Sequence, residues 1–142
     1  MDKSQDRVIP IVKLLSEIIE KKANGELKKY NITIGQVRVL GTLYYSQHQE
    51  CSLKELEKIF RTSQATIAGI VSRLEDKKLI IGFSDAQDKR IKKVKLTKEG
   101  EMLASEAQLK VNDMEKWLTS KLAKDEREEL IRLLYKVYDT IE

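Results

Sequence analysis

Two short helices and an apolar hairpin follow one another between residues 53 and 96, and this order constrains the fold more than any other feature of the chain. The first helix is expected over residues 53–60, because Ser52 and Glu55 have the spacing of a capping box. The second is expected over residues 64–76, where apolar residues recur at helical spacing after Ser63 as the N-cap. Since only about three residues separate the two helices, the pair is typical of a helix-turn-helix.

The hairpin that follows turns this unit into a winged helix. Residues 79–83 form a short apolar run, and Ile91, Val94 and Leu96 lie in a second stretch that looks extended. The intervening SDAQDKR is polar and holds a turn-forming Ser-Asp pair, so we expect it to be the exposed tip. A helix-turn-helix with such a hairpin directly after it is a winged helix.

The remaining segments are expected to be helical and to join this unit in one domain. Apolar residues recur at helical spacing in four further segments, which are 8–28, 34–46, 98–122 and 125–141. A chain of 142 residues is long enough for one core and too short for two. We therefore expect a mainly α fold with a small β-hairpin (α+β), in one domain over 1–142. Residues 32–100 form the winged helix-turn-helix, and residues 1–31 and 101–142 form flanking helices.

Positive charge is concentrated in the centre of the sequence. The whole chain carries a net charge of +4, but residues 77–98 alone hold 8 basic and 2 acidic side chains. Residues 101–142, by contrast, hold 7 basic and 10 acidic ones. A local basic patch on an otherwise balanced chain indicates a polyanionic partner, and beside a helix-turn-helix that partner is double-stranded DNA.

The second helix of the motif has an outer face suited to the major groove. If Ile67, Val71 and Leu74 face the core, the opposite side shows small or uncharged side chains, which let the backbone approach the bases. Gln64 is the favoured base reader. The alternative is that these are merely tolerated surface residues. The expected DNA contacts of this helix and its turn are Ser63, Gln64, Ala65, Thr66, Ala68, Gly69, Ser72 and Arg73.

The hairpin adds a second set of expected DNA contacts. Lys89, Lys92 and Lys93 can reach phosphates, and Arg90 at the tip can enter a narrow, negative minor groove. Asp88 is placed to orient the Arg90 guanidinium through a charge-assisted contact. The alternative is a soluble turn with a chance Asp-Arg pair.

From residue 32 to residue 103 the sequence resembles the MarR-type winged-helix transcription regulators. The matching strings are SLKELEKIFRTSQATIAGIVSRLEDKKLI and DAQDKRIKKVKLTKEG. The D-x-R motif of the family's wing falls on Asp88 and Arg90, and its Leu-Thr-x-x-Gly motif falls on residues 96–100. The chain departs from the pattern at Lys78, where glycine is usual, and at Gly82, where a basic residue is common.

The resemblance implies a homodimer that represses transcription from a pseudo-palindromic operator, with each winged helix on one half-site. Terminal helices with apolar stripes and no other domain to cover them also indicate a symmetric partner. Half-sites would then lie roughly 10 bp apart. The family also binds small aromatic effectors between the dimer helices and the winged helix. The candidate pocket residues, which could instead be core or interface aromatics, are Tyr30, Tyr44, Tyr45 and Trp117.

Other classes of function fit the sequence less well. An enzyme needs a nucleophile with a base, paired carboxylates or a phosphate-binding glycine loop, whereas this chain has one His, one Cys and six scattered Gly. No cofactor is expected, and no metal either, because His48 and Cys51 supply only two of the four ligands of a structural zinc. The remaining alternative is a winged helix that binds proteins and not DNA.

Two further expectations concern the thiol and the compartment. Cys51 is expected to be an incidental thiol and not a redox sensor, since no electropositive setting surrounds it in the sequence. The chain has no run of 18 apolar residues and no secretory signal in its opening MDKSQDRVIP. We therefore expect a cytoplasmic protein without a membrane partner.

Charge reversal at Arg90 is expected to abolish most DNA binding, because the tip would then repel the groove that it enters. Lys93→Ala is expected to weaken binding on every sequence and to lower the salt dependence, as the loss of one phosphate contact would. Titration of a selected duplex at several salt concentrations checks both. Parent-like affinity in both variants would show that the wing does not contact DNA.

Overall fold

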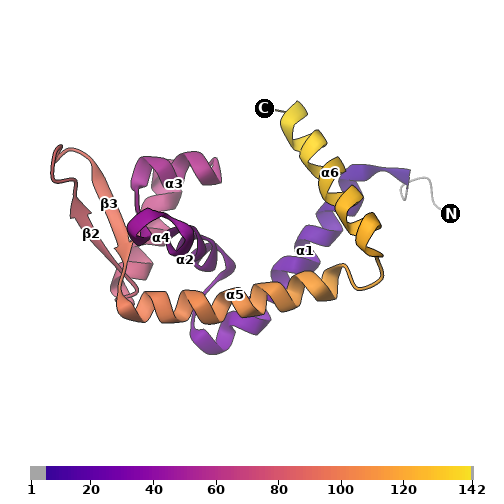
Figure 1. Cartoon of the computed structure of the whole chain (residues 1–142), viewed down its shortest axis with the longest axis horizontal. Coiled ribbons are helices and arrows are strands. Elements are labelled where there is room, and N and C mark those ends of the chain that lie inside the picture. The colour runs from indigo at the N-terminus through magenta and orange to yellow at the C-terminus, as the bar shows by residue number, and fades with distance from the viewer. Residues whose placement is uncertain (1–5, 142) are drawn as a thin grey trace. The chain divides into compact units, whose positions relative to one another are not determined.

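The computed structural model describes residues 6–141, and Figure 1 labels its α-helices and the strands β2 and β3. Residues 1–5 and 142, which belong to the predicted flanking segments, lie outside the described part. The chain divides into two compact units, residues up to 109 and residues from 110, and each is described by itself. The elements are α1 (Val8–Leu27), η2 (Lys28–Tyr30), α2 (Ile34–Tyr45), η3 (Gln47–Gln49), β1 (Glu50–Ser52), α3 (Leu53–Phe60), α4 (Gln64–Asp76), β2 (Ile80–Ser84), β3 (Lys92–Leu96), α5 (Lys98–Leu118) and α6 (Lys124–Thr140).

The core of the first unit lies among α2, α3, α4 and the sheet. Leu40 and Leu43 of α2, Leu56 of α3 and Leu74 of α4 are each fully buried, and Val94 brings β3 into the same core. The helix-turn-helix and hairpin predicted from the sequence are thereby confirmed.

Side-chain caps begin the two helices of the motif where the sequence predicts them. The Ser52 hydroxyl accepts a hydrogen bond from the Glu55 backbone N–H (3.0 Å), and the Glu55 carboxylate accepts one from the Ser52 N–H (3.3 Å). Ser63 caps α4 by accepting from the Thr66 N–H at 3.1 Å. These bonds satisfy amides that have no partner within the helix. The start of α4 is therefore set by local contacts.

The sheet has a third strand that the sequence analysis missed. Strand β1 pairs antiparallel with β3, so the order is β1-β3-β2, with Cys51 and Gly82 both opposite Val94. Three residues are too few to show an alternating pattern, and β1 runs directly into the cap of α3. The wing hairpin is thus anchored to the residues that precede the helix-turn-helix.

The corner between α4 and β2 uses a left-handed residue without glycine. Lys78 has φ 61°, its N–H donates to the Glu75 carbonyl (2.9 Å), and the Leu79 N–H donates to the Leu74 carbonyl (3.0 Å). This is the Schellman arrangement, in which glycine is the usual residue. Lys78 therefore takes the glycine's conformation in spite of its side chain.

The first turn of α5 lies directly against this corner. The Thr97 N–H donates to the Leu79 carbonyl at 3.0 Å, and the Thr97 hydroxyl donates to the Lys78 carbonyl at 2.7 Å. The same hydroxyl accepts from the Gly100 N–H at 3.0 Å. A Cβ built on Gly100 would overlap the Leu79 carbonyl oxygen, so only glycine fits at this position.

The helix at the end of the chain starts earlier than predicted. The apolar pattern places the start of this helix at residue 125, but α6 begins at Lys124. There the Glu126 carboxylate accepts from the Ala123 N–H at 2.9 Å. Alanine has no side-chain oxygen, so the sequence carries no N-cap signal at this position. Helix α5 also ends at Leu118, four residues before the predicted end.

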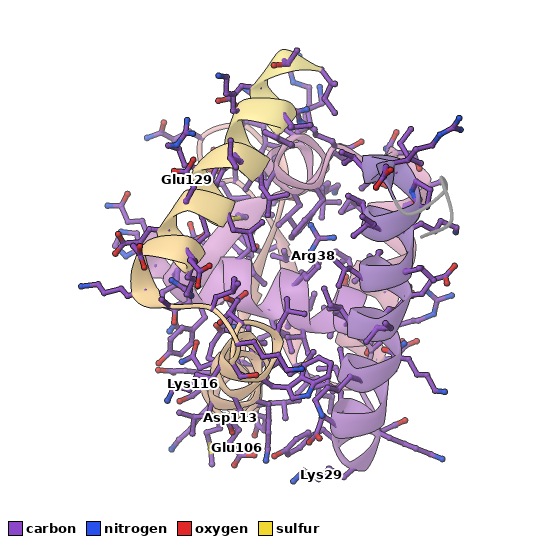
Figure 2. All side chains as sticks on the ribbon, turned by 90° about the vertical axis from the view of Figure 1, so that its right-hand side faces the viewer. Lys29, Arg38, Glu106, Asp113, Lys116 and Glu129 are labelled. Atoms are coloured by element: carbon purple, nitrogen blue, oxygen red, sulfur yellow. The ribbon has the colours of Figure 1, made fainter. Side chains whose placement is uncertain are left out.

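Large apolar side chains stay exposed on α1 of the first unit and on α6 of the second. Seven of them on α1 are 43–82% exposed, and seven on α6 are 38–65% exposed. Figure 2 labels Glu129, one of the charged residues of α6. The predicted apolar stripes are therefore present, and each is left exposed by the rest of its own unit.

Two glycine-to-alanine substitutions are expected to change stability in opposite directions. Gly100→Ala should lower the free energy of unfolding by about 1–3 kcal/mol, because the new methyl group must displace the Leu79 backbone. Gly25→Ala in α1 should raise the free energy of unfolding by about 0.5–1 kcal/mol. Apart from its chain neighbours and the backbone of its own helix, no described atom lies within 4 Å of a Cβ built there. Urea unfolding at one fixed protein concentration measures both. A neutral Gly100→Ala would contradict the close approach of α5 to the corner.

Candidate nucleic-acid interface

The outer face of α4 is exposed as the sequence predicts. Ile67, Val71 and Leu74 are buried, while the predicted contact residues of this helix and its turn are exposed or, for Gly69, half-buried. The Arg73 guanidinium folds back over Gly69, with its nearest nitrogen 3.5 Å from the position of a Cβ there. The face therefore offers small groups and hydroxyls, with one cation at its centre.

The wing tip is ordered by Asp88. Its carboxylate accepts from Nε and from a terminal nitrogen of Arg90, both at 3.1 Å, and from the Arg90 backbone N–H at 3.0 Å. The Arg90 side chain is nevertheless 91% exposed. This pairing lowers the pKa of Asp88 and raises that of Arg90, so both stay charged near neutral pH. The guanidinium is held in one direction and remains open to a ligand.

The wing lysines differ in how free their ammonium groups are. Lys89 and Lys92 are exposed, and the Lys92 ammonium lies 3.5 Å from the Ser84 hydroxyl. The Lys93 ammonium lies 3.2 Å from a carboxylate oxygen of Asp85 and 3.5 Å from one of Glu50, and its side chain is 25% exposed. Lys93, predicted to face phosphate, is therefore already paired with two carboxylates of its own sheet.

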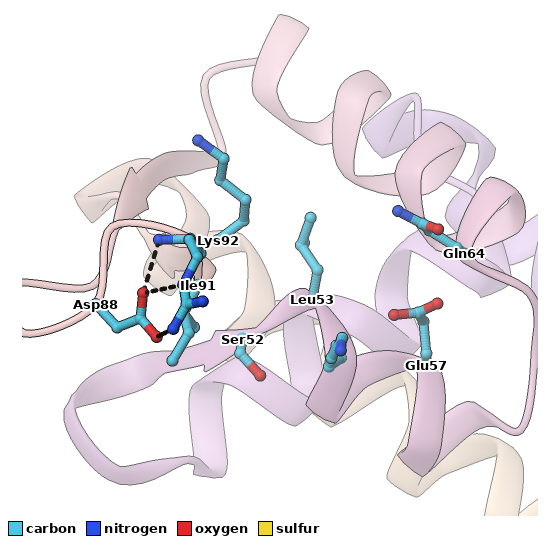
Figure 3. Close-up of a pocket in the computed structure, with 9 residues that line it drawn as sticks. Ser52, Leu53, Glu57, Gln64, Asp88, Ile91 and Lys92 are labelled. Carbon is cyan, nitrogen blue, oxygen red and sulfur yellow. Dashed lines mark hydrogen bonds and ion pairs between the residues drawn. The ribbon is translucent and has the colours of Figure 1, made fainter.

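A cavity of about 570 Å³ brings the two sets of predicted contacts together (Figure 3). Gln64 of α4 lies on one side of it, and Asp88 and Lys92 of the wing lie on the other. Helix α3 supplies its floor, including Lys54 and Glu57, which the sequence analysis did not single out. The only sequence signal for them is that both are polar positions between apolar ones in α3. The lining residues are Ser52, Leu53, Lys54, Glu57, Gln64, Asp88, Arg90, Ile91 and Lys92.

Three of the four aromatic residues predicted for an effector pocket, Tyr30, Tyr44 and Tyr45, belong to the first unit. Tyr44 and Tyr45 touch edge to face with ring centres 5.2 Å apart, and the Lys29 ammonium lies 5.1 Å from the centre of the Tyr30 ring. Trp117 belongs to the second unit, which is described separately. A second cavity of about 670 Å³, between α1 and the start of α2, is lined mainly by polar side chains and not by these aromatics.

Cys51 lies on the edge strand β1. It is buried, and its sulfur lies 3.1 Å from the Ser46 hydroxyl. Burial raises the pKa of the thiol, and nearby Glu55 and Glu50 add to the shift. A buried thiol of raised pKa holds little thiolate near neutral pH, and thiolate is the reactive form.

The described residues show neither a metal-binding cluster nor a membrane-spanning helix. Across residues 6–141, no three His, Cys, Asp or Glu side chains converge in a way that suits a metal ion. No helix in the same part of the chain has the length and hydropathy needed to cross a bilayer.

Comparison with known proteins points to one family. Residues 32–92 match the MarR family. The structure is similar to that of S. aureus MepR in a DNA complex, with a TM-score of 0.88 and 30% sequence identity over 93% of this chain and 96% of that one. It is also similar to MepR in its DNA-binding conformation, with the same identity and coverage and a TM-score of 0.82. A mutant of MarR from E. coli complexed with operator DNA gives 0.82 at 26% identity, over 90% of this chain and 91% of that one.

The environment of Cys51 predicts a thiol that is inert until the protein unfolds. At pH 8 the native protein should react slowly with a disulfide reagent such as DTNB, because the thiol is both covered and protonated. The same protein in concentrated urea should react at the rate of a free thiol. Equal rates in the two conditions would reopen the interpretation of Cys51 as a redox sensor.

Proposed function

The chain belongs to the MarR family of DNA-binding transcription regulators, and we propose that it is a sequence-specific repressor that acts as a homodimer on a pseudo-palindromic operator. Members of this family are regulators and not enzymes. The observation that carries the proposal is the single cavity that Gln64 of the exposed α4 face lines together with Arg90 of the wing. One duplex can then contact both elements.

In this proposal, α4 enters the major groove. Small groups at Ala65, Ala68 and Gly69 let the helix backbone approach the base edges, and Gln64 is the side chain with the reach to read one. The exposed hydroxyls and Arg73 contact phosphates or bases beside it. The cap at Ser63 and Thr66 supports this role, because their hydroxyls lie 2.9 Å apart and organise the entry of the helix.

The wing supplies the second contact. Arg90 enters the minor groove next to the half-site, where a narrow A·T-rich groove has the most negative potential. Lys89 and Lys92 contact the phosphates on either side, since their ammonium groups are exposed. The bidentate contact with Asp88 supports this assignment because it fixes the direction of the guanidinium before DNA is bound.

The homodimer is supported by the uncovered apolar faces of the predicted flanking segments, 1–31 and 101–142. In the second unit no residue of α6 is buried, and Ile131, Leu134 and Tyr138 line an open cavity of about 730 Å³ beside the Arg127–Glu115 ion pair. In the first unit α1 is exposed in the same manner. Apolar surface on this scale marks an interface, and a symmetric pairing of two copies is the commonest kind.

Release by a small-molecule effector completes the proposal. Its support is the family membership alone. The aromatic residues expected to form its pocket lie in two separately described units, so we name no site for it.

Selection from a random duplex library at two salt concentrations tests the proposed function. The parent protein should retain an inverted repeat with half-sites roughly 10 bp apart, and its affinity should fall steeply with salt. Weak retention without a common motif would contradict the proposal and favour the protein-interaction module instead.

Two variants show which element reads the sequence. Gln64→Ala should relax specificity at one base pair of each half-site, at a cost of about 1–3 kcal/mol per site. Lys92→Ala should weaken binding by a similar factor on matched and mismatched duplexes alike. Identical motif profiles for the parent and Gln64→Ala would exclude Gln64 as the base reader.

A further inference from the structure

We propose that Lys93 is a positioning residue that fixes the wing in its DNA-binding shape, together with Asp85 and Glu50, and that it does not contact phosphate. The role of Lys93 in binding rests on the proposed function, whereas its contacts with Asp85 and Glu50 are present in the protein without DNA. It replaces the sequence-based expectation for Lys93.

The first step is the placement of the Lys93 ammonium between two carboxylates. Lys93 lies on the central strand β3, Glu50 on the neighbouring strand β1 and Asp85 just after β2. Their side chains are 25%, 27% and 25% exposed, so solvent reaches each of them only in part. The ammonium thus links the ends of all three strands. Because two carboxylates offset the charge of the ammonium, it should attract a phosphate on the outside of the wing only weakly.

Asp85 also binds the backbone of the wing tip. While one carboxylate oxygen of Asp85 faces Lys93, the other accepts from the backbone N–H groups of Gln87 and Asp88, both at 3.1 Å. The Asp85 N–H in turn donates to the Ile91 carbonyl at 3.0 Å. An aspartate that binds the amides two and three residues ahead holds a turn in one conformation. Lys93 therefore holds the Asp85 side chain, which in turn holds the turn at Gln87 and Asp88.

Asp85 is connected to Arg90 through Asp88. The amide held by Asp85 belongs to Asp88, whose carboxylate binds the Arg90 guanidinium through both oxygens. A continuous series of contacts therefore runs from Lys93 through Asp85 and Asp88 to Arg90. Since exposed ion pairs contribute little to stability, the effect of this series is to restrict the wing before it binds. A restricted loop loses less conformational entropy when DNA orders it.

If Asp85 positions the wing, its removal should weaken DNA binding, whereas its charge alone predicts stronger binding. A carboxylate near the DNA repels phosphates, so its removal should strengthen binding if electrostatics decides the outcome. The pairing lowers the pKa of Asp85 and raises that of Lys93, which keeps the pair ionised near neutral pH. Removal of the Asp85 charge should therefore lower DNA affinity if Asp85 positions the wing, and raise it if Asp85 only repels phosphates.

The test compares Asp85→Asn, Lys93→Met and the control Lys92→Met on the duplex selected for the parent. Asp85→Asn and Lys93→Met should each weaken binding by about tenfold, which corresponds to one or two side chains that must be ordered on binding. Their slope of log affinity against log salt should equal that of the parent. Lys92→Met should reduce this slope by about one, because it removes a phosphate contact.

Hydrogen exchange of the free protein supplies the second readout. The amides of Gln87 and Asp88 should exchange faster in Asp85→Asn and Lys93→Met and at the parent rate in Lys92→Met. Tighter binding by Asp85→Asn, a reduced salt slope for Lys93→Met or unchanged exchange in both would overturn the inference. A parent protein that binds no duplex would instead refute the proposed function, and the exchange rates would still decide the positioning role.

Discussion

The close approach of α5 to the corner between α4 and β2 is the contact on which the proposed DNA-binding surface depends. Gly100 has no room for a side chain because the Leu79 carbonyl occupies that space, and Thr97 binds the backbone of both Lys78 and Leu79. The end of α4 and the start of the wing are therefore fixed by one short segment. A change in this segment alters the position of the wing relative to α4.

Beyond this junction, the surface is assembled from contacts that order each element before DNA is present. The cap at Ser63 sets the start of α4, β1 holds the hairpin through β3, and Asp85 and Asp88 set the tip. Each of these contacts is weak when it is considered alone. Together they reduce the number of conformations that binding must exclude, which raises affinity without any added contact to the duplex.

The sequence predicted those features that depend on residues close together in the chain. Ser52 with Glu55 and the hydroxyl of Ser63 lie within three residues of the amides that they cap, so the motif's helices begin where expected. Features that depend on distant residues were not predictable in this way. The partners of Lys93 include Glu50 on a three-residue strand without a pattern, so a basic residue of the wing was read as a phosphate contact. Likewise, α6 begins after an alanine, which carries no capping signal.

The central claim is that the wing tip lies in the minor groove while α4 occupies the adjacent major groove. Because Cys51 is the chain's single cysteine, Cys51→Ala combined with Lys89→Cys places one attachment point at the tip for an iron-EDTA cleavage reagent. Bound to the selected duplex, the labelled protein should cut both strands in the minor groove next to each half-site, as a tip beside Arg90 requires. Cleavage spread evenly along the duplex, or confined to the major groove, would contradict the account.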